Sequence, residues 1–253
     1  LRDVCVCRGR KTLLLRRRCG QNGAERFGAT GEGVFMSDVL LSIDCSNRWS
    51  CLGLAVDGKI AGERNLDLGR AQAARLPLLA AELLAGCGLN VRNVTCVAAT
   101  VGPGYFTGIR IGMAYAAGLA FALGIEVVPL SSLEAVLRSC PGWDRGVKAP
   151  LIAASRELAF SSAYRDGRPV LVEKERAYEE LLSELHEISH DFEMWSVKDA
   201  RLFAASSREG VQHIANPSGA AQAALALERL HTSIKPDELR ARYLREPGLG
   251  RSL

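Results

Sequence analysis

The dipeptide Asp57-Gly58 places the strongest constraint on how this chain folds. It separates two strand-like runs, Ser50 to Val56 and Lys59 to Leu66. Asp-Gly between two such runs is typical of a type I′ hairpin turn, because both of its central residues take positive φ. A further strand-like run, Val39 to Asp44, comes just before this hairpin. The sequence therefore predicts three consecutive antiparallel strands.

The elements that follow the hairpin extend this prediction. The patterns predict a helix over Ala71 to Leu84, a strand over Val94 to Thr100, a helix ending near Leu123, a strand over Ile125 to Val128 and a helix over Ser131 to Arg138. This is the order of a ribonuclease H-like lobe, the unit of the sugar kinase, actin and chaperone ATPase superfamily. The order of helices and strands indicates a fold, but by itself it says nothing about function. We predict an α/β fold of the ribonuclease H-like, actin-like ATPase (ASKHA) class, with two lobes of mixed sheets flanked by helices.

Pro141, Gly142 and Gly146 predict a boundary between the lobes. The candidate elements beyond it are strands over Ala149 to Ala154, Glu157 to Tyr164 and Arg201 to Ala205, a turn at Asp166-Gly167, and helices over Tyr178 to Ile188 and Ser218 to Leu230. We assign residues 36–146 to an N-terminal lobe and 147–253 to a smaller C-terminal lobe and tail. Residues 1–35 lack periodicity and are expected to be a disordered arm or a mis-assigned leader, with a basic nucleic-acid tail as the alternative.

Charge and cysteine content argue against some kinds of function for this chain. The net charge is +4, and residues 1–35 hold eight basic against three acidic side chains, so the rest is close to neutral. Such a body lacks the broad cationic surface that sequence-independent RNA binding needs. The eight cysteines show no metal-ligand spacing and are expected to be reduced thiols. We find no signal-peptide core and no run of about 18 apolar residues, and so expect a soluble, cytoplasmic protein.

A glycine-rich loop joins the predicted strand ending at Thr100 to the next helix. Gly102 and Gly104 permit positive φ and close backbone approach, and Thr107 can cap the helix. Free amides at that helix start would suit an anion. The loop lacks the lysine of a P-loop and the last glycine of a dinucleotide fingerprint. Nucleotide binding at Gly102, Gly104 and Thr107, together with Asp44, therefore stays open beside a simple tight turn.

The longer string around this loop is more specific. GPGYFTGIRIG, which begins at Gly102, closely resembles the GPGSFTGxRIG signature of the TsaB family. Leu41 to Ser46 is similar to that family's opening strand and Asp-containing turn, Val128 to Ala135 to its next strand-helix junction, and Tyr243 to Arg245 to its C-terminal ending. The resemblance covers roughly residues 38–140. Tyr105 departs from the usual Ser, and Ile152 to Arg156 replaces an Ile-Asp-Ala-Arg type of strand end.

The resemblance implies a function and a set of partners. It implies a non-catalytic subunit that binds a TsaD-type catalytic paralogue and supports threonylcarbamoyl transfer to the adenosine next to the anticodon of tRNA. A TsaE-type ATPase is a further expected partner, and tRNA would be contacted indirectly. A homodimer, and ATP or ADP at the interface of the complex, remain open. No cofactor of its own and no membrane are expected.

The helix after the loop carries a stripe of small residues. Gly108, Gly112, Ala116 and Ala120 recur every four residues and so share one face. Such a face permits close packing, either within the lobe or against another subunit. In the resembled family this region joins TsaD through a helical bundle. We therefore predict an interface at Gly108, Gly112, Met113, Ala116 and Ala120.

Histidine placement favours a non-catalytic role. TsaD relatives hold a metal with an H-x-x-x-H on the helix that corresponds here to residues 131–138, where Ser132 and Val136 stand. Neither side chain can replace an imidazole ligand. Asp44 could be the remnant of a magnesium-side aspartate, or could form an Asx-type turn with Ser46 and Asn47, which we favour.

Two other functions compete with this reading. His186, Glu187 and His190 form a literal H-E-x-x-H, the pattern of a zinc metalloprotease. The same segment fits an amphipathic helix with Leu181, Leu182 and Leu185 inward, which is the simpler interpretation. An ATP-binding, sugar-kinase-like phosphotransferase would use Asp44 and the loop from Gly102 to Gly108.

Overall fold

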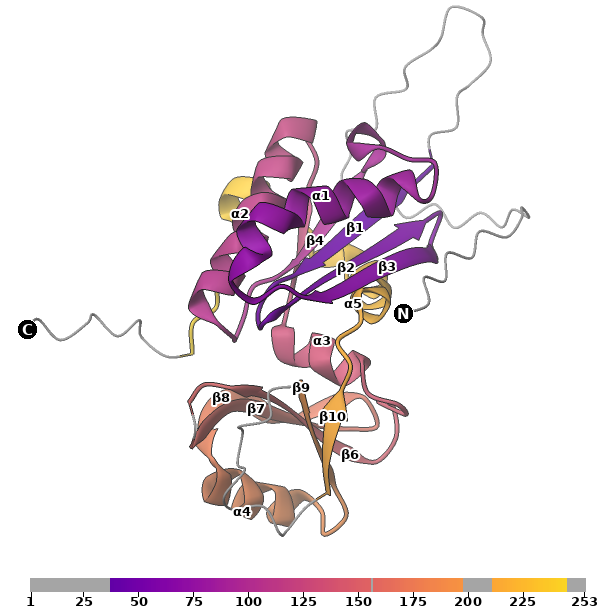
Figure 1. Ribbon diagram of the computed structural model, residues 1–253. Helices are drawn as coiled ribbons and strands as arrows, with labels where there is room; N and C mark the ends of the chain where they lie inside the picture. The colour runs from indigo at the N-terminus through magenta and orange to yellow at the C-terminus, as the bar shows by residue number, and fades with distance from the viewer. Residues whose placement is uncertain (1–36, 156, 198–210, 245–253) are drawn as a thin grey trace, which may run out of the picture.

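The computed structural model describes residues 37–155, 157–197 and 211–244. They form two lobes, each built on a five-stranded mixed sheet, stacked one on the other (Figure 1).

The first sheet is built by the first half of the chain. Its elements are β1 (Val39–Asp44), β2 (Trp49–Val56), β3 (Lys59–Asp67), α1 (Gln72–Ala85), β4 (Cys96–Thr100), α2 (Phe106–Leu123) and β5 (Val127–Leu130), followed by α3 (Ser132–Arg138). The strand order is β3-β2-β1-β4-β5. The first three strands pair antiparallel, and β1, β4 and β5 run parallel. Asp57 and Gly58 have φ of 49° and 74°, which confirms a turn with two positive φ values.

The second sheet repeats this pattern. Its elements are β6 (Val147–Ala153), β7 (Leu158–Arg165), β8 (Arg168–Ala177), α4 (Tyr178–Ile188), β9 (Glu193–Val197) and β10 (Val211–Ala215). The order β10-β9-β6-β7-β8 has the same directions as the first sheet. Each lobe therefore has the ribonuclease H-like arrangement, and the predicted fold class is confirmed. The strands β8, β9 and β10 were not predicted, and the strand predicted over Arg201 to Ala205 lies outside the described residues.

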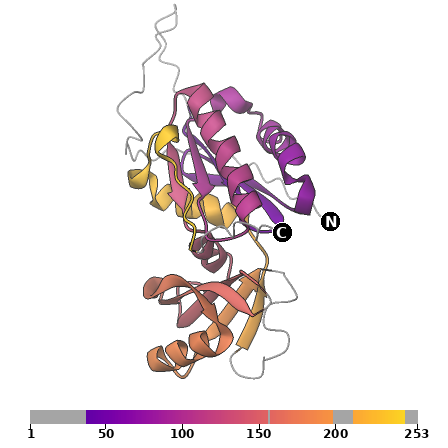
Figure 2. The same cartoon turned by 90° about the vertical axis from the view of Figure 1, so that its left-hand side faces the viewer.

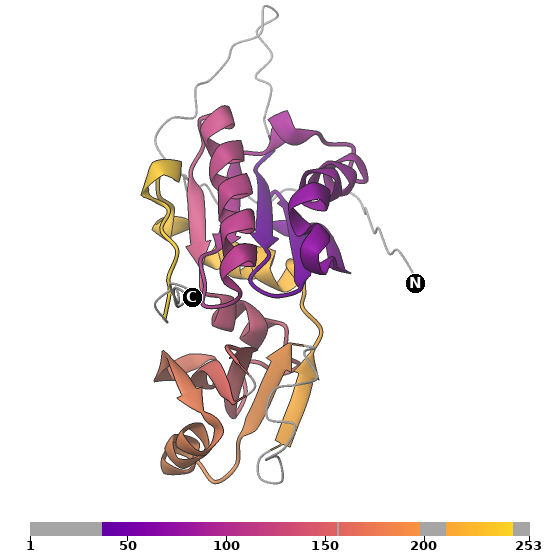
Figure 3. The ribbon, with the colours of Figure 1, turned by 60° about the vertical axis from the view of Figure 1, so that its left-hand side comes forward.

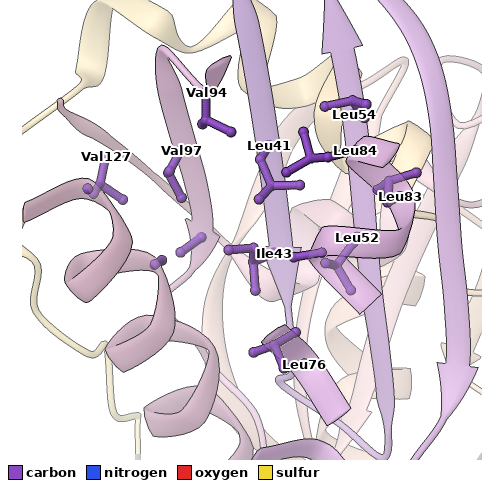
Figure 4. Packing of buried hydrophobic residues seen from close by; sticks show 14 of the residues in the cluster. Leu41, Ile43, Leu52, Leu54, Leu76, Leu83, Leu84, Val94, Val97 and Val127 are labelled. Carbon is purple, nitrogen blue, oxygen red and sulfur yellow. The ribbon is translucent and has the colours of Figure 1, made fainter. Parts of the chain in front are cut away.

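The first sheet is covered on both faces. Alternate residues of β1 point to opposite sides. Leu41 and Ile43 pack with Leu52 and Leu76 in the core on the α1 and α2 side, whereas Leu40 packs on the other side (Figure 4). That other side is covered by α5 (Gly219–Glu228), which Figures 1 and 3 show against the sheet.

The position of α5 corrects the predicted lobe assignment. Residues 147–253 were assigned to the second lobe, but α5 packs against β1, β2 and β3 of the first. An amphipathic pattern tells which residues of a helix are buried but not which sheet buries them. The contact is close, since a Cβ added to Gly53 would overlap the backbone of Gly219. Glu63 on β3 accepts hydrogen bonds from Ser218 Oγ (2.8 Å) and Ala220 N (2.9 Å), so the start of α5 is anchored to the sheet edge.

The short helix α3 lies at the junction of the two lobes (Figure 2). Leu133 and Val136 belong to a buried cluster with Ile152, Phe160 and Trp195 of the second sheet. The two connections between the lobes also meet, because Ser218 N donates to Ser139 Oγ at 3.2 Å. The lobes therefore share an apolar core rather than meeting across a polar cleft alone.

Helix α2 is long and apolar. Its 18 residues have a mean hydropathy of 1.4, which by length and composition alone would suffice to cross a membrane. The sequence was expected to hold no run of about 18 apolar residues, and this helix corrects that expectation by its length and mean hydropathy. In the structure one side of α2 packs on the first sheet, as the core helix of a lobe does.

Candidate functional site

The glycine-rich loop is held between two other segments. Gly102 and Gly104 have φ of 114° and 159°, values that favour glycine. A Cβ on Gly102 would lie 2.6 Å from the Arg242 carbonyl oxygen, and one on Gly104 would overlap the backbone of Ser46. Tyr105 N donates to Ser46 O at 2.7 Å. The two glycines are thus needed for contact with the β1–β2 turn and the C-terminal segment.

The C-terminal segment packs on the start of α2. Arg242 N donates to Val101 O at 2.7 Å. The rings of Phe106 and Tyr243 are 5.0 Å apart, and Arg110 Nε donates to Tyr243 Oη at 3.0 Å. The Arg110 guanidinium stands 3.6 Å from the Phe106 ring centre. The family-like ending of the chain and the family-like loop therefore form one unit, although Arg110 and Tyr243 lie 133 positions apart in the sequence.

Asp44, at the end of β1, is 3% exposed. Its Oδ1 accepts hydrogen bonds from Ser46 N (2.7 Å) and Thr100 Oγ1 (2.6 Å), and its Oδ2 from Gln222 Nε2 (3.1 Å). Burial raises the pKa of Asp44, and these hydrogen bonds oppose the rise. The bond to Ser46 N is the expected Asx-type turn. Thr100 and Gln222 were not predicted as partners of Asp44, and no local pattern marks Gln222, which comes from the distant helix α5.

A groove of about 1020 Å³ opens beside this loop, with walls from both lobes. Gly104, Tyr105 and Thr107 line it from the loop and the start of α2, and Ala153 and Phe160 line it from the second sheet. Three arginines, Arg48, Arg70 and Arg242, also line it. Of the residues predicted for nucleotide binding, Gly104 and Thr107 line the groove, and Asp44 and Gly102 do not.

The small-residue stripe of α2 faces its own sheet. Gly108, Gly112, Ala116 and Ala120 are all buried, and a Cβ on Gly108 would overlap the Cys45 carbonyl oxygen. The predicted interface on these four residues is therefore corrected, and Met113 is only half-buried. A four-residue repeat defines one face of a helix, but small residues suit packing on a sheet as well as on another helix.

The opposite side of α2 is open. Ala114, Gly118, Phe121 and Ala122, which we call the outer face of α2, are all exposed. Phe121 has 81% of its surface exposed, and among the described residues no atom outside the neighbouring backbone of α2 lies within 4 Å of a Cβ placed on Gly118. This face thus combines one large exposed apolar side chain with small residues that would let a partner helix approach closely.

The H-E-x-x-H segment does not form a metal site among the described residues. Helix α4 ends at Ile188, and Ser189 is extended, so His190 lies beyond the helix. The His186 and His190 rings are 6.1 Å apart. No group of three or more His, Cys, Asp or Glu side chains that could hold a metal occurs in the part of the chain that the structure describes. Leu181, Leu182 and Leu185 are buried, which confirms the amphipathic helix.

The two positions predicted to correspond to the metal ligands of TsaD relatives are buried. Ser132 and Val136 on α3 are 0% and 5% exposed. Ser132 N donates to Gly102 O at 3.0 Å, which ties α3 to the loop. These two positions therefore serve packing at the lobe junction.

The chain is similar to known proteins over much of this architecture. The profile of the TsaD family, described as tRNA N6-adenosine threonylcarbamoyltransferase, matches residues 67–185. The tRNA threonylcarbamoyladenosine biosynthesis protein TsaB of Haemophilus influenzae is 32% identical over 129 residues, which are 50% of this chain and 54% of that protein. The Bacillus subtilis protein of the same name is 28% identical over 126 residues, covering 50% and 55% of the two chains. The chain thus spans about half the length of the curated relatives it matches.

A solved structure extends the likeness to both lobes. The crystal structure of a Pseudomonas aeruginosa protein with similarity to peptidase YEAZ superposes with a TM-score of 0.70 at 23% identity. It covers 82% of this chain and 100% of that one, which shows that the two proteins share their fold. The loop, the paired lobes and these matches together show that the chain is similar to TsaB and YeaZ proteins, and that residues 67–185 resemble the TsaD family.

Proposed function

We propose that this protein is a non-catalytic, cytoplasmic subunit that binds a TsaD-type enzyme and supports threonylcarbamoyl transfer to the adenosine next to the anticodon of tRNA. The relatives named for tRNA threonylcarbamoyladenosine biosynthesis support the pathway. The single observation that supports the binding role is the outer face of α2, where Phe121 is 81% exposed beside Gly118 and Ala122.

The physical case rests on how α2 is held. Its buried stripe packs against the sheet at Gly108 and Ala116, so the helix needs no rearrangement to present its other side. Preformed surfaces lose less entropy on binding. Ala114 and Gly118, one turn apart, let a partner helix approach closely, and burial of Phe121 would contribute roughly 1.5–3 kcal/mol. A helix of the TsaD-type partner is the occupant that we propose for this face.

The chemistry of the first lobe supports a non-catalytic role. Both carboxylate oxygens of Asp44 are occupied by the protein's own donors, and Ser132 and Val136 offer no metal ligand. In this proposal the TsaD-type subunit supplies the catalytic residues and the contacts to tRNA. A TsaE-type ATPase, and ATP or ADP at the joint interface, belong to the complex rather than to this chain alone.

The test places a long charged side chain on the outer face of α2. Gly118→Arg meets open space, so the fold should be retained, while docking of a helix should be blocked. Binding to the TsaD-type protein of the same cell, measured by calorimetry, is expected to weaken about 100-fold or more. The amount of threonylcarbamoyladenosine in bulk tRNA should fall when the variant replaces the normal protein.

Ser183→Arg on the exposed side of α4 is the matched control, because it adds the same charge to a helix of the other lobe. It is expected to leave both measurements unchanged. Equal binding by the two variants would show that the outer face of α2 is not the interface. Turnover of a tRNA substrate by the purified chain on its own would remove the non-catalytic role.

A further inference from the structure

The groove between the lobes combines positive charge with a lack of acidic side chains. Arg48, Arg70 and Arg242 line it, and no carboxylate does among the residues that the structure describes. The Arg48 pair with Asp67 is long, at 3.4 Å, and the two side chains are 59% and 41% exposed, so a ligand carboxylate can replace Asp67 at little cost. Arg70 is exposed. Arg242 pairs with Glu173 through one nitrogen at 2.8 Å, which leaves further donors.

Two other donors face the same region. Asn47 is 7% exposed and lines the groove, and its Nδ2 atom has no hydrogen-bond partner in the described part of the chain. A buried amide without a partner costs about 1–3 kcal/mol, so an acceptor there would be stabilising. At the start of α2, Phe106 and Thr107 carry backbone N–H groups that have no partner within the helix, and they lie at the positive end of a helix of 18 residues. The groove therefore offers hydrogen-bond donors and positive charge to a negatively charged ligand.

The rest of the lining is apolar. Phe106 and Ile111 contribute from α2, Phe160 from β7 and Leu244 from the C-terminal segment. A small anion would contact the arginines and leave these side chains in water. The volume of about 1020 Å³ is at the upper end for small-ligand pockets, so it suits an occupant of several residues.

A nucleotide fits less well. Phosphates held with a magnesium ion need a free carboxylate, and the carboxylate of Asp44 is buried, is occupied and does not line the groove. Ala153 and Ala154 stand at the end of β6 without a polar side chain to meet a phosphate. A nucleic-acid strand would need cations beyond the groove, and the chain outside residues 1–35 is close to neutral.

We propose that the groove receives an acidic, partly apolar peptide segment of a partner protein. Its carboxylates pair with Arg48, Arg70 and Arg242, and its aliphatic or aromatic side chains pack against Phe106 and Ile111. The groove shares no residue with the outer face of α2, so this site is separate from the proposed docking of the TsaD-type enzyme.

The test uses the full chain and a fluorescein-labelled eight-residue peptide of alternating glutamate and leucine. Fluorescence anisotropy should show saturable binding that weakens as salt is raised. A peptide of alternating lysine and leucine should not bind. Arg70→Glu reverses the charge of an exposed groove residue and is expected to weaken binding at least tenfold.

Arg75→Glu is the matched control, because Arg75 is exposed on α1 and does not line the groove. It should bind the acidic peptide as the wild type does, and both variants should keep the wild-type urea midpoint. The proposal is overturned if both charge reversals weaken binding equally, or if the lysine peptide binds as well as the glutamate peptide. Displacement of the acidic peptide by millimolar Mg-ATP or by a short oligonucleotide, in preference to unlabelled peptide, would assign the groove to those ligands instead.

Discussion

Asp44 joins three elements through one carboxylate, which accepts hydrogen bonds from the β1–β2 turn, from Thr100 on β4 and from Gln222 on α5. Its pKa is raised from 3.8, because burial disfavours the charged form more than the hydrogen bonds favour it. The folded state therefore holds the proton more tightly than the unfolded state. The resulting stability is fully present below the unfolded pKa and is lost as pH rises through the raised folded pKa.

The substitution Asp44→Asn tests this charge. The Gln222 amide can turn to accept a hydrogen bond from the new amide, because its Oε1 has no partner among the described atoms. We expect the variant to gain stability relative to the wild type as pH rises from about 4 to about 7, by about 1.4 kcal/mol for each unit of raised pKa. Urea unfolding at several pH values measures this, with Asp237→Asn on the exposed surface as control. A difference that does not change with pH would contradict the raised pKa.

Helix α2 requires glycine on its buried side but not on its exposed side. Gly108 lies against the Cys45 backbone, whereas Gly118 faces open space on the same helix. Gly108→Ala is expected to destabilise the protein by about 1–3 kcal/mol through overpacking. Gly118→Ala should stabilise it by about 0.5–1 kcal/mol, because glycine is a poor helix former. Urea midpoints of the two variants check both signs, and equal shifts would mean that α2 is not seated as described.

Local sequence patterns predicted those helices and strands whose bounds depend mainly on their own residues. The bounds of β1 and of α4 are as predicted. The strand β8 was missed because Glu173 to Arg176 reads as a polar segment. Its Arg176 is in fact 2% exposed, and it is held by Glu184 at 2.6 Å and by the Ser161 carbonyl at 3.1 Å. Such partners, like Gln222 for Asp44 and the sheet for Gly108, come from distant segments that a local pattern does not identify.

Over the whole molecule, the two lobes are expected to unfold together. Leu133 of α3 is fully buried in the cluster that joins the first lobe to Phe160 and Trp195 of the second. Leu133→Ala should cost about 2–5 kcal/mol and lower the stability of both lobes at once. Urea unfolding can be followed by the fluorescence of single-tryptophan forms that keep either Trp49, in the first lobe, or Trp195, in the second. The two tryptophans should report the same midpoint as each other, both with and without the Leu133→Ala substitution. Separate transitions for the two tryptophans would show that the lobes are independent.

The return of α5 to the first sheet has a consequence for biosynthesis. When β5 has left the ribosome, the face formed by Leu40, Ala55, Ala98 and Val128 still lacks its covering helix, which comes about a hundred residues later. At translation rates of about 5–20 residues per second, this apolar face stays uncovered for roughly 5–20 seconds. The nascent first lobe must therefore wait for the second to be synthesised before it can close, and during that interval it is a natural client for a chaperone.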